Sequence, residues 1–140
     1  MLTNGFLNEA LKHKDVTHDL DLALKYAYLA ASATYSPRAD VCCVLGEIYL
    51  MKGNYIWAKN WYEKALYNET TGFDEKRPDQ EFYGSIPMLK LGFILHNLGR
   101  NEEATDYFKA VLKIEPDNQT AKENLSLIQK EIEENTVEKK

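Results

Sequence analysis

The sequence predicts an all-α fold built from antiparallel helix pairs, and three observations lead to this prediction. Residues 39–66 contain two short helix patterns separated by Gly53-Asn54, each with apolar residues at helical spacing. Residues 85–118 repeat the same order of small, apolar and aromatic residues. Leu125 follows Leu91 by 34 residues, which places a further helix in the register of another copy. We therefore expect about seven helices in the chain.

The two copies agree position by position. The first copy has the order Leu45-Gly46, Tyr49, Gly53, Ala58, Tyr62 and Ala65-Leu66, and the second has Leu91-Gly92, Leu95, Gly99, Ala104, Phe108 and Val111-Leu112. Small residues at Gly46 and Ala58 allow two helices to approach closely, while the larger ones fill the space around the contact. Because neither helix can bury its apolar face alone, each pair is expected to pack against neighbouring pairs.

This pattern resembles the tetratricopeptide repeat (TPR), in which Leu-Gly, Tyr, Ala, Phe and Pro recur over a period of about 34 residues. The resemblance implies a right-handed superhelix of antiparallel helix pairs. The chain departs from the family pattern at Cys42 and Met88, where the family usually has Trp. It also spaces Leu45 and Leu91 by 46 residues, which indicates an insert of about a dozen residues between the repeats.

We expect a single domain over residues 1–140 with five parts. These are a degenerate first repeat at 4–36, a repeat at 39–66, an insert at 67–84, a repeat at 85–118 and a capping helix at 119–134. The first repeat lacks a Leu-Gly pair but keeps Ala23, Ala27 and Ala30 at helical spacing. The capping helix has apolar residues on one face and charged residues elsewhere, as a terminal repeat element requires.

Composition favours a soluble, reduced, cytoplasmic protein. The chain is 44% apolar and 28% charged, as is usual for globular domains. Its net charge of −5 argues against binding to nucleic acid, and no basic run or long apolar run suggests a membrane. The two cysteines, Cys42 and Cys43, are adjacent, which favours reduced thiols, with Cys42 as a small core residue. The first ten residues lack a signal-peptide pattern.

The sequence contains no recognisable catalytic set, metal site or cofactor motif. His13, Asp15, His18 and Asp19 crowd one short connection without a distant ligand, so a solvated turn is favoured over a metal site. Asp19-Leu20-Asp21 matches the Asp-x-Asp motif of glycosyltransferases. It opens a helix instead of ending a strand, so acidic residues at a helix start explain it better. We therefore expect no enzymatic activity and no cofactor for this chain.

In TPR proteins the first helices of successive repeats line a concave groove that binds peptides or partner segments. The resemblance carries the groove positions over to Asp40, Cys43, Glu47, Leu50 and Met51 in one repeat, then to Leu89, Lys90, Phe93, His96 and Asn97 in the next. This groove is half apolar, with an acidic spot at Glu47. It lacks the Lys and Asn clamp of chaperone-binding members, so a co-chaperone function is not expected.

Two further groups of aromatic residues have alternative interpretations. Trp57 and Trp61 are expected to pack between repeats, with a binding platform as the alternative. Phe73, Phe82 and Tyr83 lie among the charges of the insert, where each exposed ring would forgo about 1.5–3 kcal/mol of burial. These three rings either fold over the groove as a lid or extend the core between repeats. The sequence favours neither.

A narrower resemblance covers residues 19–128. The segments that carry it are Pro37-Arg38-Ala39-Asp40, Cys42-Cys43, Leu45-Gly46, Trp61-Tyr62, Gly72-Phe73 and Pro87 before Leu91. They resemble the repeat region that follows the catalytic domain of some bacterial family 2 glycosyltransferases. The expected function is a scaffold without catalysis that binds a protein, a peptide or a second protomer. The alternative is the non-catalytic C-terminal part of such a glycosyltransferase, which positions the acceptor or mediates assembly.

Overall fold

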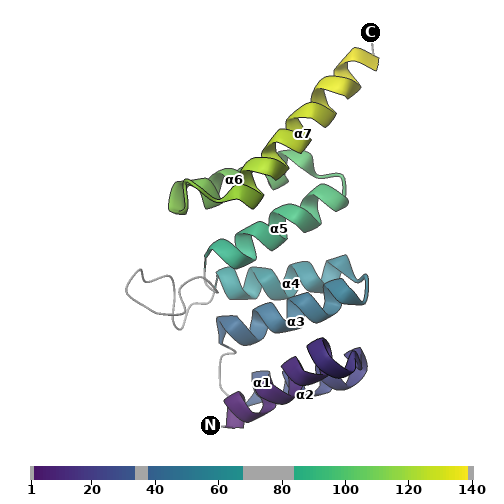
Figure 1. Cartoon of the computed structure of the whole chain (residues 1–140), viewed down its shortest axis with the longest axis vertical. Helices are drawn as coiled ribbons and strands as arrows, with labels where there is room; N and C mark the ends of the chain where they lie inside the picture. Colours follow the sequence, from purple (N-terminus) through teal and green to yellow (C-terminus); the bar gives the residue numbers. More distant parts are fainter. Residues whose placement is uncertain (1, 34–37, 68–83, 139–140) are drawn as a thin grey trace. The chain divides into compact units, whose positions relative to one another are not determined.

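The computed structural model describes residues 2–33, 38–67 and 84–138, which form seven α-helices, one π-helix and no strand (Figure 1). In chain order the elements are α1 (Leu2–Lys12), the π-helix η1 (His13–Thr17), α2 (Leu20–Ser32), α3 (Ala39–Met51), α4 (Tyr55–Leu66), α5 (Ser85–Asn97), α6 (Asn101–Ile114) and α7 (Gln119–Glu138). The prediction of an all-α fold with about seven helices is confirmed.

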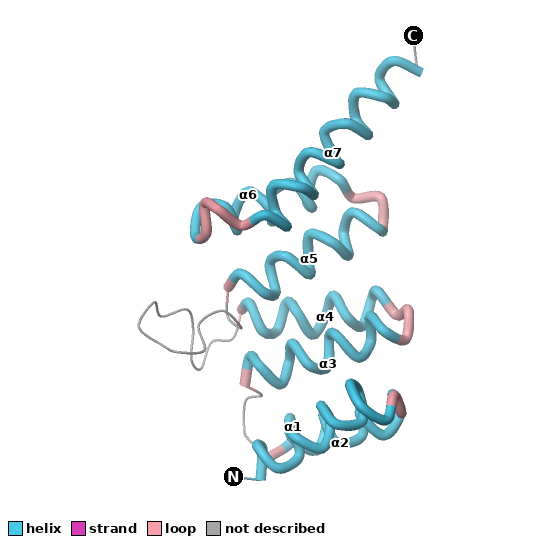
Figure 2. The backbone as a smooth tube through the Cα atoms, viewed as in Figure 1, coloured by secondary structure: helices cyan, strands magenta, loops and turns pink. Residues whose placement is uncertain are grey.

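The chain divides into two compact units, Met1–Pro87 and Met88–Lys140. The first unit contains α1 to α4, and α1 packs on α2, α2 on α3 and α3 on α4. The second contains most of α5 together with α6 and α7, and α6 packs on α7. Short loops join α3 to α4 and α6 to α7 (Figure 2).

Helix boundaries follow from local sequence signals. Asp19 precedes α2, and its side-chain Oδ1 accepts a hydrogen bond from the Leu22 backbone N–H at 3.1 Å. Asn54 caps α4 in the same way, because its Oδ1 accepts a hydrogen bond from the Trp57 backbone N–H at 3.1 Å. Gly53 has a φ of 78°, a backbone conformation that glycine adopts without strain, and it follows the end of α3. The prediction that Asp19 starts a helix is therefore confirmed.

An aromatic ring packs on a glycine of the preceding helix in both units. A Cβ added to Gly46 of α3 would lie 2.6 Å from a ring carbon of Tyr62 on α4. A Cβ added to Gly92 of α5 would lie 2.7 Å from a ring carbon of Phe108 on α6. Both rings are fully buried. The two glycines thus let the second helix approach the first more closely than any side chain would allow, as the sequence predicted.

The core of the first unit spans α1 to α3, and much of it is alanine. Its buried members include Ala10, Ala23, Ala27, Ala30, Val41, Val44, Leu45 and Ile48. Alanines on α1 and α2 let these helices pack closely without the Leu-Gly pair that the first repeat lacks. The core of the second unit joins α5, α6 and α7 through Leu95, Ala104, Phe108, Val111, Ala121 and Ile128.

We expect Gly46→Leu to lower the free energy of unfolding by about 1–3 kcal/mol, because the new side chain must displace Tyr62. Urea titration would measure the change. Gly5→Ala is the matched control, since a Cβ at Gly5 of α1 meets nothing within 4 Å. It should leave stability unchanged or raise it by about 0.5–1 kcal/mol. Equal effects of the two substitutions would contradict the proposed packing.

Candidate binding surface

The groove positions on α3 differ in how open they are. Cys43 is buried, with 5% of its surface exposed, so its thiol adds little to any binding surface. Leu50 is half-buried, and Met51 is 46% exposed. Asp40 accepts hydrogen bonds from Arg38, from Nε at 3.0 Å and from Nη2 at 2.6 Å. Met51 is therefore the large apolar side chain that α3 leaves open among these five positions.

Glu47, the predicted acidic spot, is paired with a buried lysine. Lys14 lies in η1 with only 6% of its side chain exposed, and its Nζ donates to Glu47 Oε1 at 3.1 Å and to Asp15 Oδ1 at 2.6 Å. Burial alone would lower the pKa of Lys14, but the hydrogen bonds to the two carboxylates outweigh it and raise the pKa above its ordinary value. Lys14 thus stays charged and compensates part of the negative charge of Glu47.

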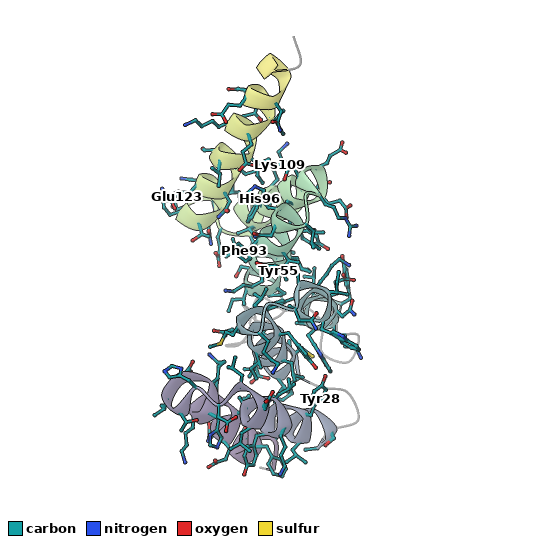
Figure 3. All side chains as sticks on the ribbon, turned by 90° about the vertical axis from the view of Figure 1, so that its right-hand side faces the viewer. Tyr28, Tyr55, Phe93, His96, Lys109 and Glu123 are labelled. Atoms are coloured by element: carbon teal, nitrogen blue, oxygen red, sulfur yellow. The ribbon has the colours of Figure 1, made fainter. Side chains whose placement is uncertain are left out.

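The groove positions on α5 combine an open aromatic ring with polar groups that are already bonded. Phe93 is 43% exposed, whereas Leu89 is half-buried against the core of the second unit. His96 Nε2 lies 2.8 Å from Glu131 Oε2 of α7, and Asn97 Nδ2 donates to the Phe93 carbonyl oxygen at 2.8 Å. Phe93 and His96 are labelled in Figure 3. Among the groove positions on α5, the exposed apolar group is therefore the ring of Phe93.

The α3 positions belong to the first unit, and the α5 positions to the second. A continuous groove formed by both sets therefore stays a prediction. Phe73, Phe82 and Tyr83 lie outside the described residues. Both interpretations of the insert, as a lid over the groove or as an extension of the core, stay predictions as well.

An aromatic cluster links α2, α3 and α4 in the first unit. The hydroxyls of Tyr28 and Tyr49 are 2.7 Å apart. Tyr49 stacks on Trp57 with ring centroids 6.1 Å apart, and Tyr28 meets Trp61 edge-on at 5.7 Å. Burial and the hydrogen bond with Tyr28 raise the pKa of Tyr49 to about 12. Trp61 thus packs against the preceding helix pair, while Trp57 remains 51% exposed.

No cluster of three or more metal-binding side chains occurs in the described part of the chain. The ring of His13 stacks on Tyr26, and its Nδ1 lies 2.9 Å from Thr17 Oγ1. The imidazole is therefore already in contact with two side chains of the protein. Cys42 is 1% exposed, and burial raises the pKa of its thiol to about 12, so it is a poor nucleophile at neutral pH. Among the described helices, none combines the length and apolar character needed to cross a membrane.

Sequence reasoning did not find the Lys14–Glu47 pair. The two residues are 33 positions apart, and the π-helix that places Lys14 had no signal in the polar stretch from His13 to His18. The Tyr28–Tyr49 contact was missed for the same reason, since it joins residues 21 positions apart. The nine tyrosines of the chain were the signal that could have suggested it.

We expect Glu47→Ala to destabilise the protein by about 1–3 kcal/mol, because it removes one of the two partners of a buried ammonium group. The double variant Lys14→Met/Glu47→Gln should lose less than the sum of its single variants, as measured by urea titration. The exposed pair Lys52–Asp21, at 2.5 Å, is the matched control. Asp21→Asn there should leave the stability nearly unchanged, because water screens the charge of this exposed carboxylate. Additive effects at Lys14 and Glu47 would contradict the coupling.

Comparisons with known proteins identify the repeats. Residues 39–69 and 88–118 match the family model of the tetratricopeptide repeat. The chain is similar to the structure of the Arabidopsis OM64 TPR domain, with 18% identity, a TM-score of 0.76 and coverage of 92% of this chain and 95% of that chain. It is similar also to the crystal structure of MamA, with 16% identity, a TM-score of 0.74 and coverage of 91% and 67%. Among curated proteins, no sequence matches this one. Residues 39–69 and 88–118 are therefore similar in sequence to tetratricopeptide repeats, and the all-α fold is similar to that of solved TPR domains.

Proposed function

We propose that this chain is a scaffold that binds a protein or peptide partner through the first helices of its repeats. The observation that carries the proposal is the exposure of one large apolar side chain at a groove position of each repeat, Met51 on α3 and Phe93 on α5. Polar groups at neighbouring groove positions, such as Glu47 and His96, are engaged within the protein. Recognition would therefore rest on apolar contacts.

Phe93 has the properties of an anchor for a partner. Covering a phenylalanine ring is worth about 1.5–3 kcal/mol relative to leaving it in water, and aromatic residues supply much of the energy of protein interfaces. Lys90 precedes Phe93 by three positions on α5, a spacing that places both on neighbouring parts of the helix surface. Within the described residues Lys90 forms no ion pair. It can therefore meet a carboxylate or carbonyl group of a partner segment that covers Phe93.

We expect Phe93→Ala to weaken the binding of peptides selected on the wild-type chain from a random displayed library by about 10-fold or more. Ile114→Ala is the matched control, because Ile114 on α6 is 42% exposed, nearly as much as Phe93, but lies on a second helix. Fluorescence anisotropy with the selected peptides would measure both variants. Equal losses in both, or a loss only at Ile114, would contradict a site on the first helices.

The alternative, a non-catalytic part of a family 2 glycosyltransferase, stays a prediction, since the matched family model describes the repeats and does not concern glycosyltransferases. In either role we propose that the isolated chain has no catalytic activity. Both carboxylates of Asp19-Leu20-Asp21 already have structural roles, because Asp19 caps α2 and Asp21 forms an ion pair with Lys52. The reduced, buried thiols of Cys42 and Cys43 support the proposal of a cytoplasmic location.

We expect the purified chain to hydrolyse no UDP-sugar in the presence of Mn²⁺, because neither carboxylate of the Asp-x-Asp motif joins a metal-binding cluster among the described residues. Release of UDP in a coupled assay would measure turnover. Asp19→Asn is the control, since Asn is also a good helix cap and should preserve the fold. Turnover that Asp19→Asn abolishes would show that the motif binds a nucleotide and a metal.

A further inference from the structure

α7 occupies the position of a first helix, and its outer face differs from those of α3 and α5. Gly46, Gly92 and Ser126 are each the eighth residue of their helices, α3, α5 and α7. Tyr62 covers Gly46 and Phe108 covers Gly92. Ser126 is small like the two glycines, but it is exposed. The described residues therefore supply no ring at the one position where the repeat pattern requires one.

The exposed side of Ser126 belongs to a groove between α6 and α7 within the second unit. The groove has a volume of about 460 Å³ and is open to solvent. Its lining includes Thr105 and Lys109 from α6, together with Leu125, Ser126, Ile128 and Lys130 from α7. Ile128 is 1% exposed and belongs to the core, so the base of the groove is continuous with the packed interior of this unit. If a further repeat followed α7, its second helix would pack in this groove and bury the face that carries Leu125, Ser126 and Ile128.

We propose that this groove binds an amphipathic helix of a partner protein, and that the helix places an aromatic ring on Ser126. The ring would occupy the position that Tyr62 has at Gly46 and Phe108 has at Gly92. Leu125 and Ile128 provide the apolar contacts that an amphipathic helix buries when it docks in a groove. This site is separate from the proposed anchor on Phe93, which does not line the groove.

The charges of the groove define the polar face of the partner helix. Lys109, labelled in Figure 3, and Lys130 line the groove, and neither forms an ion pair in the part of the chain that the structure describes. One acidic residue, Glu133, is also in the lining, and Gln129 Nε2 donates to it at 3.5 Å. The excess positive charge favours a helix with acidic residues near its aromatic ring. The sequence of α6 has this character, with Glu103 and Asp106 before Phe108.

A labelled synthetic peptide with the sequence of residues 99–116 is therefore a suitable probe, and fluorescence anisotropy with the full chain would measure its binding. We expect it to bind, and the same peptide with Phe108→Ala to bind at least about tenfold more weakly. In the protein, Ser126→Leu should weaken binding by a similar factor, because it fills the place of the ring. Lys109→Glu/Lys130→Glu should also weaken it, and peptide variants with Glu103→Lys and Asp106→Lys should restore the loss.

Thr120→Leu is the matched control, since Thr120 is an exposed residue of α7 outside the groove lining. It should leave peptide binding unchanged. Binding that is lost with Ser126→Leu and retained with Thr120→Leu and Phe93→Ala supports the proposal. Absence of binding overturns the proposal. Equal binding to the wild-type chain and to the Ser126→Leu variant also overturns it, because the peptide could then be displacing the chain's own α6, which would not depend on Ser126. A concentration-dependent dimer that Ser126→Leu dissociates also overturns it, because the occupant would then be a second copy.

Discussion

The contact between an aromatic ring and the backbone of a glycine is the constraint on which both repeats depend. Tyr62 lies on Gly46, and Phe108 lies on Gly92, at distances that leave no room for a methyl group. Because interiors are packed nearly as densely as organic crystals, such a contact fixes both the separation of the two helices and their rotation. The face of α3 or α5 that meets the second helix is thereby determined. The residues that each first helix leaves exposed follow from the same contact.

Ion pairs and hydrogen bonds then decide which exposed groups remain for recognition. In the first unit Lys14 joins η1 to Glu47 of α3, and in the second unit His96 joins α5 to Glu131 of α7. Each pair ties two helices of its unit together and also engages a polar groove position. The remaining large group on α5 is Phe93, whose side chain is exposed. The surface of the first helices is therefore better suited to apolar segments than to strongly charged ones.

Local signals explain why the helices were predictable and several contacts were not. The glycine and aromatic spacing, and the cap at Asp19, depend on residues close in sequence, so their pattern is visible without coordinates. The π-helix adds residues after α1 and turns Lys14 inward, and nothing in its sequence signals that change of helical period. Predicting the Lys14–Glu47 pair requires the packing of α1 and η1 against α3. The register of the TPR pattern made Cys43 a groove candidate, whereas its burial depends on how neighbouring helices cover α3.

The capping helix shows how one element can both complete a core and present a new surface. Ala121 and Ile128 of α7 close the core of the second unit, which accounts for the predicted apolar stripe and for the register of Leu125. The same register puts Ser126 at the position that an aromatic ring covers in the two matched repeats. A capping helix with only large polar residues there would block any further helix. Ser126 is a small residue beside Leu125, and Lys109 and Lys130 form no ion pair with any described residue. This face is therefore open to a helix of opposite charge.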